Sequence, residues 1–293
     1  MKVELTPGKY ILAVSGGVDS MALLDLLAKK PDLELVVAHF DHGIRPESGQ
    51  DAQFVEEATK SYGLPFEIAH ATLGPKASEA AAREARYAFL EEIRVKHGAK
   101  AIITAHHQDD MVETAVINIL RGTGSRGLVS IQSNPKVKRP LLGVKKAQIL
   151  NYAGESHLKW REDATNQQEK YLRNYIRRRV VPKLGVEERR QLIKNIDKVA
   201  EINAISSDII ATLSHQLLKD DKIERQTYAS LPTAVSRELL TEWLRQRDLR
   251  NFDRRLIERV DTAIRTSADG RLVNIARSLK LYMTPETATF ESS

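Results

Sequence analysis

Short apolar runs alternate with longer amphipathic stretches through the first half of the chain. Gly63 and Gly98 stand where two of the amphipathic stretches end, as glycines often do after helices. Strands separated by helices form parallel sheets, so the pattern predicts an α/β fold, a Rossmann-like parallel sheet with helices on both faces. The expected strands are Tyr10–Val14, Leu33–His39, Pro65–Ala69 and Ala101–Ala105. The expected helices are Asp19–Lys29, Ser48–Tyr62, Ser78–His97 and Asp109–Arg121.

The pattern changes from about Lys183 onward. Val186–Leu218, Thr233–Arg247 and Asp253–Thr266 have the spacing of amphipathic helices, and the last stretch contains β-like runs such as Leu279–Met283. No combination of residues typical of catalysis occurs in this half. The sequence therefore predicts two domains, an α/β domain over residues 1–184 and a smaller, mainly helical accessory domain over residues 185–293.

The connection after the first expected strand is rich in glycine and in hydroxyl groups. A buried strand that ends in a Gly-Gly turn and opens a helix offers backbone N–H groups to an anion, and glycine lets the chain approach a phosphate closely. Asp19 adds a carboxylate that can hold Mg²⁺ beside a polyphosphate. The Walker pattern GxxxxGK(S/T) is absent and no lysine follows the glycines, which favours release of pyrophosphate over transfer of the γ-phosphate. An ordinary strand–turn–helix connection is the alternative. The candidate phosphate-binding residues are Ser15, Gly16, Gly17, Val18, Asp19 and Ser20.

Polar residues also gather after the second and the fourth expected strands, in the segments His39–Arg45 and Thr104–Thr114. The carboxyl ends of parallel strands meet at one edge of a sheet, so we expect these segments to share one crevice with the glycine turn. Asp110 and Glu113 stand three positions apart at the start of a helix and therefore share a face. Acidic residues in a first turn also complement the helix dipole, which is the alternative interpretation.

Two further patterns resemble a zinc site and a dinucleotide-binding motif, but we interpret neither of them as such a site. His39 with His42, and His106 with His107, lack the spacing of zinc ligands, and histidines at strand ends more often form hydrogen bonds. The segment Gly122–Gly127 matches GxGxxG, but it follows a helix instead of a strand. We therefore expect neither a zinc site nor a dinucleotide site, and we expect this segment to form a loop over the crevice.

Composition narrows the class of protein. The chain has 293 residues, of which 42% are hydrophobic and 29% are charged, as in globular proteins. Its longest apolar runs have the length of strands, and Met1–Glu4 start no apolar leader, so we expect a cytoplasmic protein with no membrane partner. The sequence contains no cysteine, which excludes iron–sulfur clusters, thiolate chemistry and cysteine-based zinc sites.

The formal charge of +6 and the isoelectric point near 9.3 indicate a polyanionic partner, because the positive charge is clustered. Phosphate contact is the natural use of such clusters, and a solvated helix face is the alternative. Arg83 and Arg86 lie on an alanine-rich stretch with acidic neighbours, where weak intrahelical ion pairs are common. Lys145 and Lys146 are interpreted as part of a solvated helix face. The clustered residues are Lys136, Lys138 and Arg139 in one segment, and Arg173, Arg177, Arg178 and Arg179 in another.

Taken in order along the chain, the motifs resemble those of the tRNA(Ile)-lysidine synthetase family, a member of the PP-loop ATP pyrophosphatase group. The glycine turn alone is shared by many PP-loop enzymes, whereas the ordered set, which spans roughly residues 10–184, is specific. The matching segments are Ser15–Ser20, His42–Arg45, Glu79–Tyr87, Thr104–Thr114, Arg121–Gly124 with Gly127 and Leu128, Arg139–Leu142, Asp163–Asn166, and Arg173–Asn174 with Arg177, Val181 and Pro182.

The resemblance implies an ATP-dependent ligase that acts on the isoleucine tRNA with a CAU anticodon. In this family ATP adenylates the C2 carbonyl oxygen of the wobble cytidine, and pyrophosphate leaves. The ε-amine of free L-lysine then attacks C2 and displaces AMP. The product is lysidine, which changes codon reading from AUG to AUA.

The resemblance also implies roles for individual residues. Ser15–Ser20 would hold the pyrophosphate portion of ATP, with Mg²⁺ beside it. His106 would contact the substrates near the reacting centre, and Arg86 would neutralise developing charge. Asp110 and Glu113 would receive the ammonium groups of lysine, and either a carboxylate or His106 could accept the proton that the amine loses. The clustered arginines and the accessory domain would grip the tRNA.

Other functions would leave different signatures in the sequence. A tRNA thiolase of the same group would share the ATP site, but such enzymes generally need cysteines, which this chain lacks. A PP-loop ligase that acts on a small molecule would explain ATP binding but not the basic clusters. A non-catalytic RNA-binding PP-loop protein would not need His106, Asp110 and Glu113 together. A homodimer is left open.

Overall fold

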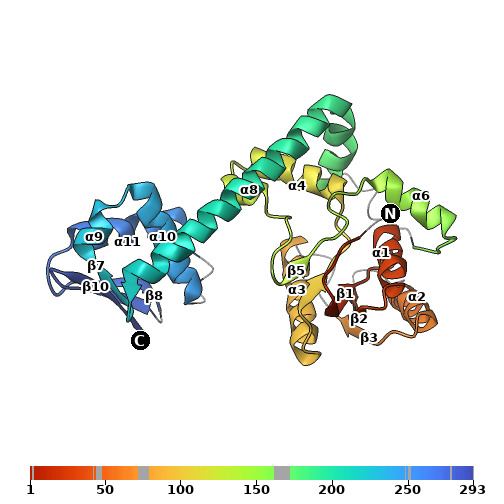
Figure 1. The fold of residues 1–293 in the computed structure, drawn as a ribbon, viewed down its shortest axis with the longest axis horizontal. Coiled ribbons are helices and arrows are strands. Elements are labelled where there is room, and N and C mark those ends of the chain that lie inside the picture. Colours follow the sequence, from red (N-terminus) through yellow and green to blue (C-terminus); the bar gives the residue numbers. More distant parts are fainter. Residues whose placement is uncertain are drawn as a thin grey trace. The chain divides into compact units, whose positions relative to one another are not determined.

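The described residues form two compact units, Met1–Ala200 and Glu201–Ser293, which are drawn in Figure 1. The computed structural model describes residues 1, 3–41, 43, 48–71, 79–161, 172–247, 249, 252–277 and 279–292. The division between the units falls within a long helix that begins at Val186. The domain boundary expected from the sequence, at 184/185, lies directly before this helix and stays a prediction.

The first unit is built on a five-stranded parallel sheet with the order β3-β2-β1-β4-β5. β1 is central, because it pairs with β2 on one side and with β4 on the other. Four of the strands confirm the expected runs, whereas β5 has only two residues and is too short to be recognised in the sequence. The strands are β1 (Gly8–Ala13), β2 (Leu33–Asp41), β3 (Phe66–His70), β4 (Ala101–Ile103) and β5 (Val137–Lys138).

Helices connect the strands and continue the chain after β5. The four helices expected in this half are confirmed to within one residue at each end. A further short helix, α7, runs into a π-helical segment, Ile176–Val180, and then into a 3₁₀ turn, Val181–Lys183. The helices are α1 (Val18–Ala28), α2 (Ser48–Ser61), α3 (Glu79–Lys96), α4 (Gln108–Leu120), α5 (Ser125–Leu128), α6 (Lys146–Glu155) and α7 (Leu172–Tyr175).

Alternate residues of β1 are buried on opposite faces of the sheet. Tyr10 and Leu12 lie in a core cluster with residues of α1 and α6, whereas Ile11 lies in a second cluster with Leu90 and Ile93 of α3. Because both faces of β1 are buried, the strand is apolar from Tyr10 to Ala13 instead of alternating with polar residues. The expectation of a parallel sheet covered by helices on both faces is confirmed.

The second unit combines helices with an antiparallel sheet of the order β6-β7-β10-β9-β8. The sequence indicated its helices and the run at β9, but not a complete sheet, since two of the strands have three residues or fewer. Trp243 is fully buried in its core, among Leu239, Leu240 and Leu281. The elements are α8 (Val186–Leu217, which begins in the first unit), β6 (Leu218–Lys219), β7 (Lys222–Glu224), α9 (Arg225–Ser230), α10 (Thr233–Gln246), α11 (Arg254–Thr266), β8 (Leu272–Ala276), β9 (Leu279–Met283) and β10 (Thr287–Ser292).

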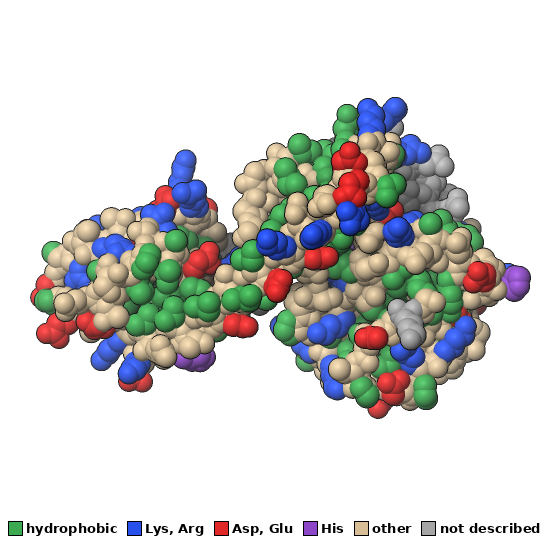
Figure 2. Space-filling model, turned by 45° about the horizontal axis from the view of Figure 1, so that its top comes forward, with side chains coloured by type: hydrophobic (Ala, Val, Ile, Leu, Met, Phe, Trp, Pro, Cys, Tyr) green, Lys and Arg blue, Asp and Glu red, His purple; other side chains and the backbone are tan. Residues whose placement is uncertain are grey.

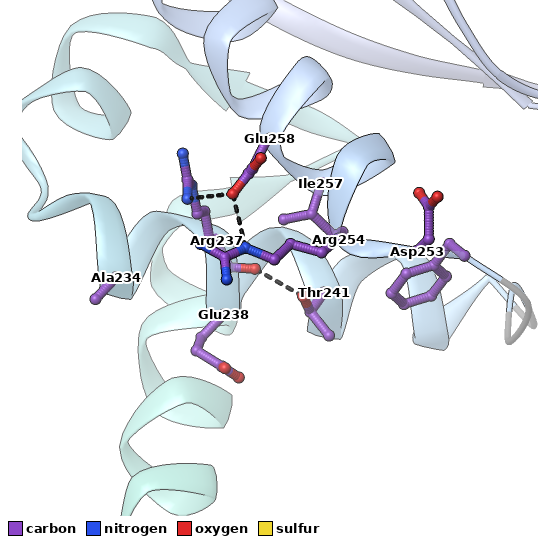
Figure 3. Close-up of a pocket in the computed structure, with 9 residues that line it drawn as sticks. Ala234, Arg237, Glu238, Thr241, Asp253, Arg254, Ile257 and Glu258 are labelled. Carbon is purple, nitrogen blue, oxygen red and sulfur yellow. Dashed lines mark hydrogen bonds and ion pairs between the residues drawn. The ribbon is translucent and has the colours of Figure 1, made fainter. Parts of the chain in front are cut away.

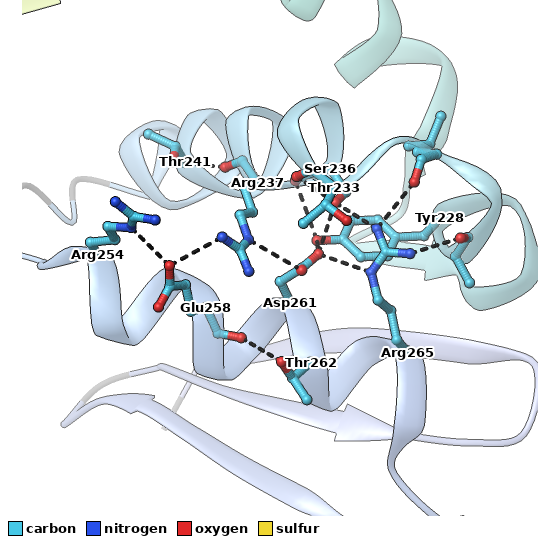
Figure 4. Close-up of polar contacts among 12 residues, drawn as sticks. Tyr228, Thr233, Ser236, Arg237, Thr241, Arg254, Glu258, Asp261, Thr262 and Arg265 are labelled. Atoms are coloured by element: carbon cyan, nitrogen blue, oxygen red, sulfur yellow. Dashed lines mark hydrogen bonds and ion pairs between the residues drawn. The ribbon is translucent and has the colours of Figure 1, made fainter. Parts of the chain in front are cut away.

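A buried carboxylate, Asp261 of α11, ties three helices of the second unit together (Figure 4). It accepts hydrogen bonds from the hydroxyl of Tyr228 in α9 at 3.0 Å and from Ser236 in α10 at 2.8 Å. Arg265 and Arg237 complete its surroundings at 3.2 and 3.4 Å. The charge is therefore paired and hydrogen-bonded, as a buried carboxylate must be if the fold is to tolerate it.

A pocket of about 440 Å³ lies between α10 and α11 of the same unit (Figure 3). Its two arginines, Arg237 and Arg254, both donate to Glu258, at 3.1 and 2.8 Å. The pocket contains none of the candidate site residues, and both of its arginines are paired within its own lining, so it is not the candidate active site. Across the described residues, no helix is both long enough and apolar enough to cross a membrane.

Candidate active site

The candidate site lies where the strand order of the first sheet reverses. β1 continues into the glycine turn and α1, and the neighbouring β4 continues into the start of α4. Connections from two adjacent parallel strands leave such a sheet in opposite directions and open a crevice at their carboxyl ends. The structure therefore brings Ser15–Ser20 and Thr104–Thr114 to one edge, as expected from their places after strands.

The glycine turn is held by hydroxyl groups and by one left-handed glycine. Gly16 has a φ of 88°, a conformation that residues with a Cβ rarely adopt. The hydroxyl of Ser20 donates to the carbonyl of Gly17 at 2.9 Å and accepts from the amide of Ser15 at 3.2 Å. Gly17 precedes α1 without a side-chain cap, so the first amides of α1 have no side-chain acceptor from that position. These features fit a phosphate-binding turn.

Two histidines support the turn and the start of α4. His39 is buried and lies 2.8 Å from the carbonyl oxygen of Val14, directly before the turn, and burial lowers the pKa of this histidine. His107 caps α4, because its Nδ1 accepts from the amide of Asp109 at 3.2 Å. In return, the carboxylate of Asp110 accepts from the amide of His107 at 3.0 Å. Capping of α4 therefore explains part of the polar character of Thr104–Thr114. Asp110 takes part in it through its side chain, whereas Asp109 takes part through its backbone amide.

His107 also connects the two halves of the site. Its Nε2 lies 3.5 Å from an oxygen of Asp110 and 3.7 Å from an oxygen of Asp19 in the glycine turn. Because Nδ1 accepts a hydrogen bond, the neutral ring carries its proton on Nε2, facing both carboxylates. One imidazole therefore joins the phosphate-binding turn to the acidic start of α4. The sequence placed His107 in the crevice but assigned it no role.

The carboxylates of Asp110 and Glu113 meet the guanidinium of Arg177, from the π-helical segment. Arg177 donates to both oxygens of Glu113, at 2.6 and 2.8 Å, and to Asp110 at 3.1 Å. Glu113 is only 2% exposed, and burial raises its pKa in spite of the guanidinium. Burial alone would also raise the pKa of Asp110, but His107, His106 and Arg177 together lower it. Two adjacent carboxylates thus have pKa values shifted in opposite directions.

His106 lies beside this cluster with its Nδ1 2.8 Å from the hydroxyl of Thr104. Burial, with the nearby guanidinium groups of Arg139 and Arg86, lowers the pKa of His106 to about 3, although the carboxylate of Asp110 opposes the shift. The imidazole is therefore neutral at neutral pH. A neutral ring can donate through one nitrogen and accept through the other, and so can contact an uncharged or an anionic group.

Arginine side chains gather around the ring of Tyr87 in α3. Arg83 and Arg86 place their guanidinium carbons 4.8 and 5.5 Å from the ring centre, and Arg139 donates to the hydroxyl of Tyr87 at 3.3 Å. Burial lowers the pKa of Arg86, and the charges of Arg83, Arg173 and Arg139 act in the same direction. Within the described part of the chain Arg86 has no carboxylate partner. The cluster is therefore strongly positive and suited to an anion.

The basic residues predicted to contact tRNA differ in exposure. Arg139 is only 6% exposed, and Arg177 is occupied by the carboxylates of α4. Arg178 and Arg179 are exposed, and Arg173 is half-buried. The structure thus separates two inward-facing guanidinium groups from exposed ones that look identical in the sequence. Among the other residues quoted from the sequence, His42, Ile44, Arg45 and Asp163–Asn166 lie outside the described residues.

The interpretation of Lys146 as part of a solvated helix face is wrong. The ammonium group of Lys146 donates to both oxygens of Asp19, at 2.6 and 2.8 Å, although the two residues are 127 positions apart. No local pattern could have shown this contact, since it depends on α6 packing beside α1. A second contact missed in the sequence joins Arg189, at the start of α8, to Asp109.

Asp19 is the carboxylate of the glycine turn that could hold a cation. In the part of the chain that the structure describes, no three His, Cys, Asp or Glu side chains form a metal site. Mg²⁺ in ATP-dependent enzymes is commonly held by one or two carboxylates together with substrate phosphates. Asp19 supplies one carboxylate at the glycine turn, so the residues fit Mg²⁺ bound with ATP better than a resident metal.

The chain matches the PP-loop domain family over residues 2–184. The tRNA(Ile)-lysidine synthase of Gloeobacter violaceus is 35% identical over 254 residues, which cover 82% of this chain and 78% of the relative. Those of Solibacter usitatus and Thermus thermophilus are 35% and 37% identical over 86% and 87% of this chain, which spans 60% and 52% of their lengths. The chain is thus markedly shorter than several of the curated relatives that it matches.

Among solved structures, the U34-tRNA thiolase NcsA from Methanococcus maripaludis, solved with its 4Fe-4S cluster, is similar with a TM-score of 0.56. The similarity covers 67% of this chain and 74% of that one, at 15% identity, and so concerns the fold alone. Family membership follows instead from the PP-loop match over more than half of the chain and from the curated relatives. On these grounds the chain belongs to the tRNA(Ile)-lysidine synthase family of PP-loop proteins.

Proposed function

We propose that the protein uses ATP to ligate L-lysine to C2 of the wobble cytidine in the CAU anticodon of isoleucine tRNA. The observation that carries this function is that the buried carboxylate of Glu113, the partly buried carboxylate of Asp110 and the phosphate-binding turn lie at one edge of one sheet. Asp110 and Asp19 are both within 4 Å of the same imidazole nitrogen of His107, at 3.5 and 3.7 Å. An amine substrate and an activated phosphate ester would therefore meet there.

The first step activates the cytidine. The C2 carbonyl oxygen attacks the α-phosphorus of ATP, and the bond from that phosphorus to the β-phosphate oxygen breaks, so pyrophosphate leaves. The amides of the glycine turn would hold the leaving pyrophosphate, with Asp19 binding Mg²⁺ beside it. Arg86 would neutralise charge that develops on the transferred phosphate, since its guanidinium lies in a positive cluster without a described carboxylate partner.

The second step forms the new C–N bond. The ε-amine of lysine attacks C2, the C2–O bond breaks, and AMP leaves with the oxygen. The attacking nitrogen must lose a proton, and Glu113 is better suited than His106 to accept it. Burial raises the pKa of Glu113, whereas the pKa of His106 is lowered to about 3, and a group with a higher pKa binds a proton more readily. His106 would then act as a neutral hydrogen-bonding group.

The charge of the acidic cluster suits a single ammonium group. Asp110 and Glu113, when ionised, carry two negative charges, and Arg177 neutralises one of them. One negative charge is left for the ammonium of lysine, most directly at Asp110, whose pKa is lowered and which is therefore ionised at neutral pH. Lysine is thus matched by charge as well as by position.

The tRNA would be held by exposed basic residues and by the C-terminal half. Lys and Arg side chains lie at many places on the surface of both units (Figure 2), in keeping with the formal charge of +6. Arg173, Arg178 and Arg179 follow the acidic cluster in the chain and could contact phosphates near the anticodon. Residues 1–184 would then form the catalytic domain and residues 185–293 an accessory tRNA-binding domain.

The test is transfer of labelled lysine to a CAU-anticodon isoleucine tRNA transcript in the presence of ATP. The matched control is the same transcript with a GAU anticodon, which offers no wobble cytidine. We expect ATP-dependent transfer to the first transcript alone. Asp110→Asn should reduce transfer by about a hundredfold, while its amide oxygen can still cap α4. No transfer by the unaltered protein, with a characterised lysidine synthase active in parallel, would refute the proposal.

A further inference from the structure

The glycine turn lacks the side-chain cation that a polyphosphate usually meets. In a Walker loop a lysine follows the glycines and reaches the phosphates, but here the residues after Gly17 are Val18, Asp19 and Ser20. Backbone amides and the helix dipole supply only partial positive charge. The nearest charge within the turn itself is the carboxylate of Asp19, which by itself would repel ATP. A cation from elsewhere in the chain would balance this charge.

Lys146 brings an ammonium group to this point. It is the first residue of α6, and it donates to both oxygens of Asp19, the second residue of α1, at 2.6 and 2.8 Å. The two side chains remain 33% and 28% exposed, so the ion pair borders solvent and a ligand can reach it. The ammonium therefore lies at the start of α1, where the phosphates of a bound nucleotide would lie.

The position of Lys146 is built into the packing of α6 on α1. Six residues further along each helix, Tyr152 of α6 donates to Asp25 of α1 at 2.5 Å. Ile149, between the two contacts, is fully buried in the core shared with α1. The two helices are thus joined at matching positions, and Lys146 is not a mobile surface lysine that happens to find an acid.

We propose that Lys146 is a nucleotide-binding residue that replaces the missing lysine of the turn. In the free protein its ammonium neutralises Asp19, and with ATP bound it donates to a phosphate oxygen while Asp19 is released to bind Mg²⁺. The role rests on the proposed use of ATP but not on lysine or tRNA. It predicts that the residue discriminates nucleotides by their phosphates, because AMP lacks the β- and γ-phosphates.

The test measures the binding of AMPCPP, an ATP analogue that resists cleavage between the α- and β-phosphates, and of AMP, by calorimetry. Lys146→Met should weaken AMPCPP binding by about tenfold or more, because a charge-assisted hydrogen bond to phosphate is lost. AMP binding should change by no more than about twofold. Lys146→Arg should keep AMPCPP binding within about threefold of the unaltered protein, because the cation is retained.

Two control variants separate this role from a structural one. Lys145→Met removes the neighbouring exposed lysine, which does not contact Asp19, and should leave both affinities unchanged. Tyr152→Phe removes the hydrogen bond from α6 to Asp25 of α1 and should lower thermal stability without changing the ratio of the two affinities. Calorimetric binding of AMPCPP by Lys146→Met within about twofold of the unaltered protein would overturn the proposal.

Other outcomes are equally decisive. If Lys146→Met and Lys146→Arg weaken AMPCPP and AMP binding to the same extent, Lys146 supports the fold and not the phosphates, and the proposal is overturned. The same conclusion follows if Lys146→Met does not fold and Lys146→Arg folds but loses AMPCPP binding. If the unaltered protein binds neither nucleotide, it is the proposed use of ATP that fails, whatever the variants do.

Discussion

Replacement of Arg177 by methionine should destabilise the first unit by leaving a buried carboxylate without its partner. Glu113 is 2% exposed, and both of its oxygens accept from the guanidinium of Arg177. Removing one member of a fully buried ion pair costs about 3–5 kcal/mol. The side chain of Arg177 is 38% exposed, however, so water can partly replace the guanidinium. We therefore expect a loss of about 2 kcal/mol at pH 7.

The loss should depend on pH with a definite sign. Burial raises the pKa of Glu113 and Arg177 opposes this shift, so the pKa rises further in Arg177→Met. Below the ordinary value of 4.5 the carboxyl group is protonated in the folded and the unfolded states alike, and the substitution costs little. As the pH rises through the raised pKa, the folded state must ionise a buried group without its cation. The deficit relative to the unaltered protein therefore grows from acid to neutral pH.

Urea unfolding at pH 5 and at pH 7.5 measures the deficit, and hydrogen exchange at α4 assigns it to the first unit. The thermal midpoint should fall by about 4–8 °C at neutral pH for a unit of this size. Arg178→Met is the matched control, since it removes an exposed arginine from the next position. A deficit below about 0.5 kcal/mol at neutral pH, or an equal deficit at both pH values, would refute the reasoning.

Two further predictions concern the second unit and the tRNA. Asp261→Asn should lower the stability of the second unit by about 2–3 kcal/mol, since a buried charged acceptor of several hydrogen bonds is lost. Faster hydrogen exchange of α10 and α11 would report this loss of stability. Glu258→Gln, on the same helix as Asp261, is the control and should change the exchange rates far less. Unaltered protection of both helices in Asp261→Asn would contradict the prediction. Arg178→Ala with Arg179→Ala should weaken tRNA binding and reduce the slope of log affinity against log salt by about one per lost phosphate contact. Filter binding over a range of salt concentrations checks this slope, and an unchanged slope would show that neither arginine contacts phosphate.

The features predicted well from the sequence are those that local spacing determines. β1, the glycine turn and α1 follow from an apolar run, two glycines and a helical pattern within about twenty residues, and the structure confirms each. To predict that the crevice residues lie together, only one further rule was needed: the carboxyl ends of parallel strands meet at the same edge of the sheet. β5 was not predicted, because its two residues, Val137 and Lys138, are too few to show the hydrophobic pattern of a strand.

The contacts that complete the site could not be predicted because they join distant segments. Lys146 and Lys145 are equivalent in the sequence, and only the packing of α6 on α1 directs one of them to Asp19. Arg177, Arg178 and Arg179 are likewise equivalent as a basic run. The π-helical turn changes the angle between successive side chains from that of an α-helix, and it places Arg177 against α4 while the next two arginines are exposed.

Three ion pairs at the crevice indicate what contacts between distant segments contribute to the site. Asp19, Asp109 and Glu113 are each joined to a base from a distant element, namely Lys146, Arg189 and Arg177. An unpaired carboxylate in this partly buried crevice would be costly. Under the proposed function, the nucleotide exchanges with one of these internal partners, whereas lysine enters where the carboxylates keep one negative charge. Phosphates take over the ammonium of Lys146, and the amine of lysine enters beside Arg177. At Lys146 one anionic partner replaces another, and at Asp110 the ammonium of lysine meets the negative charge that Arg177 leaves unpaired. Neither substrate therefore adds an uncompensated charge at these two contacts, and the energy of phosphate and ammonium recognition is kept for positioning the reacting atoms.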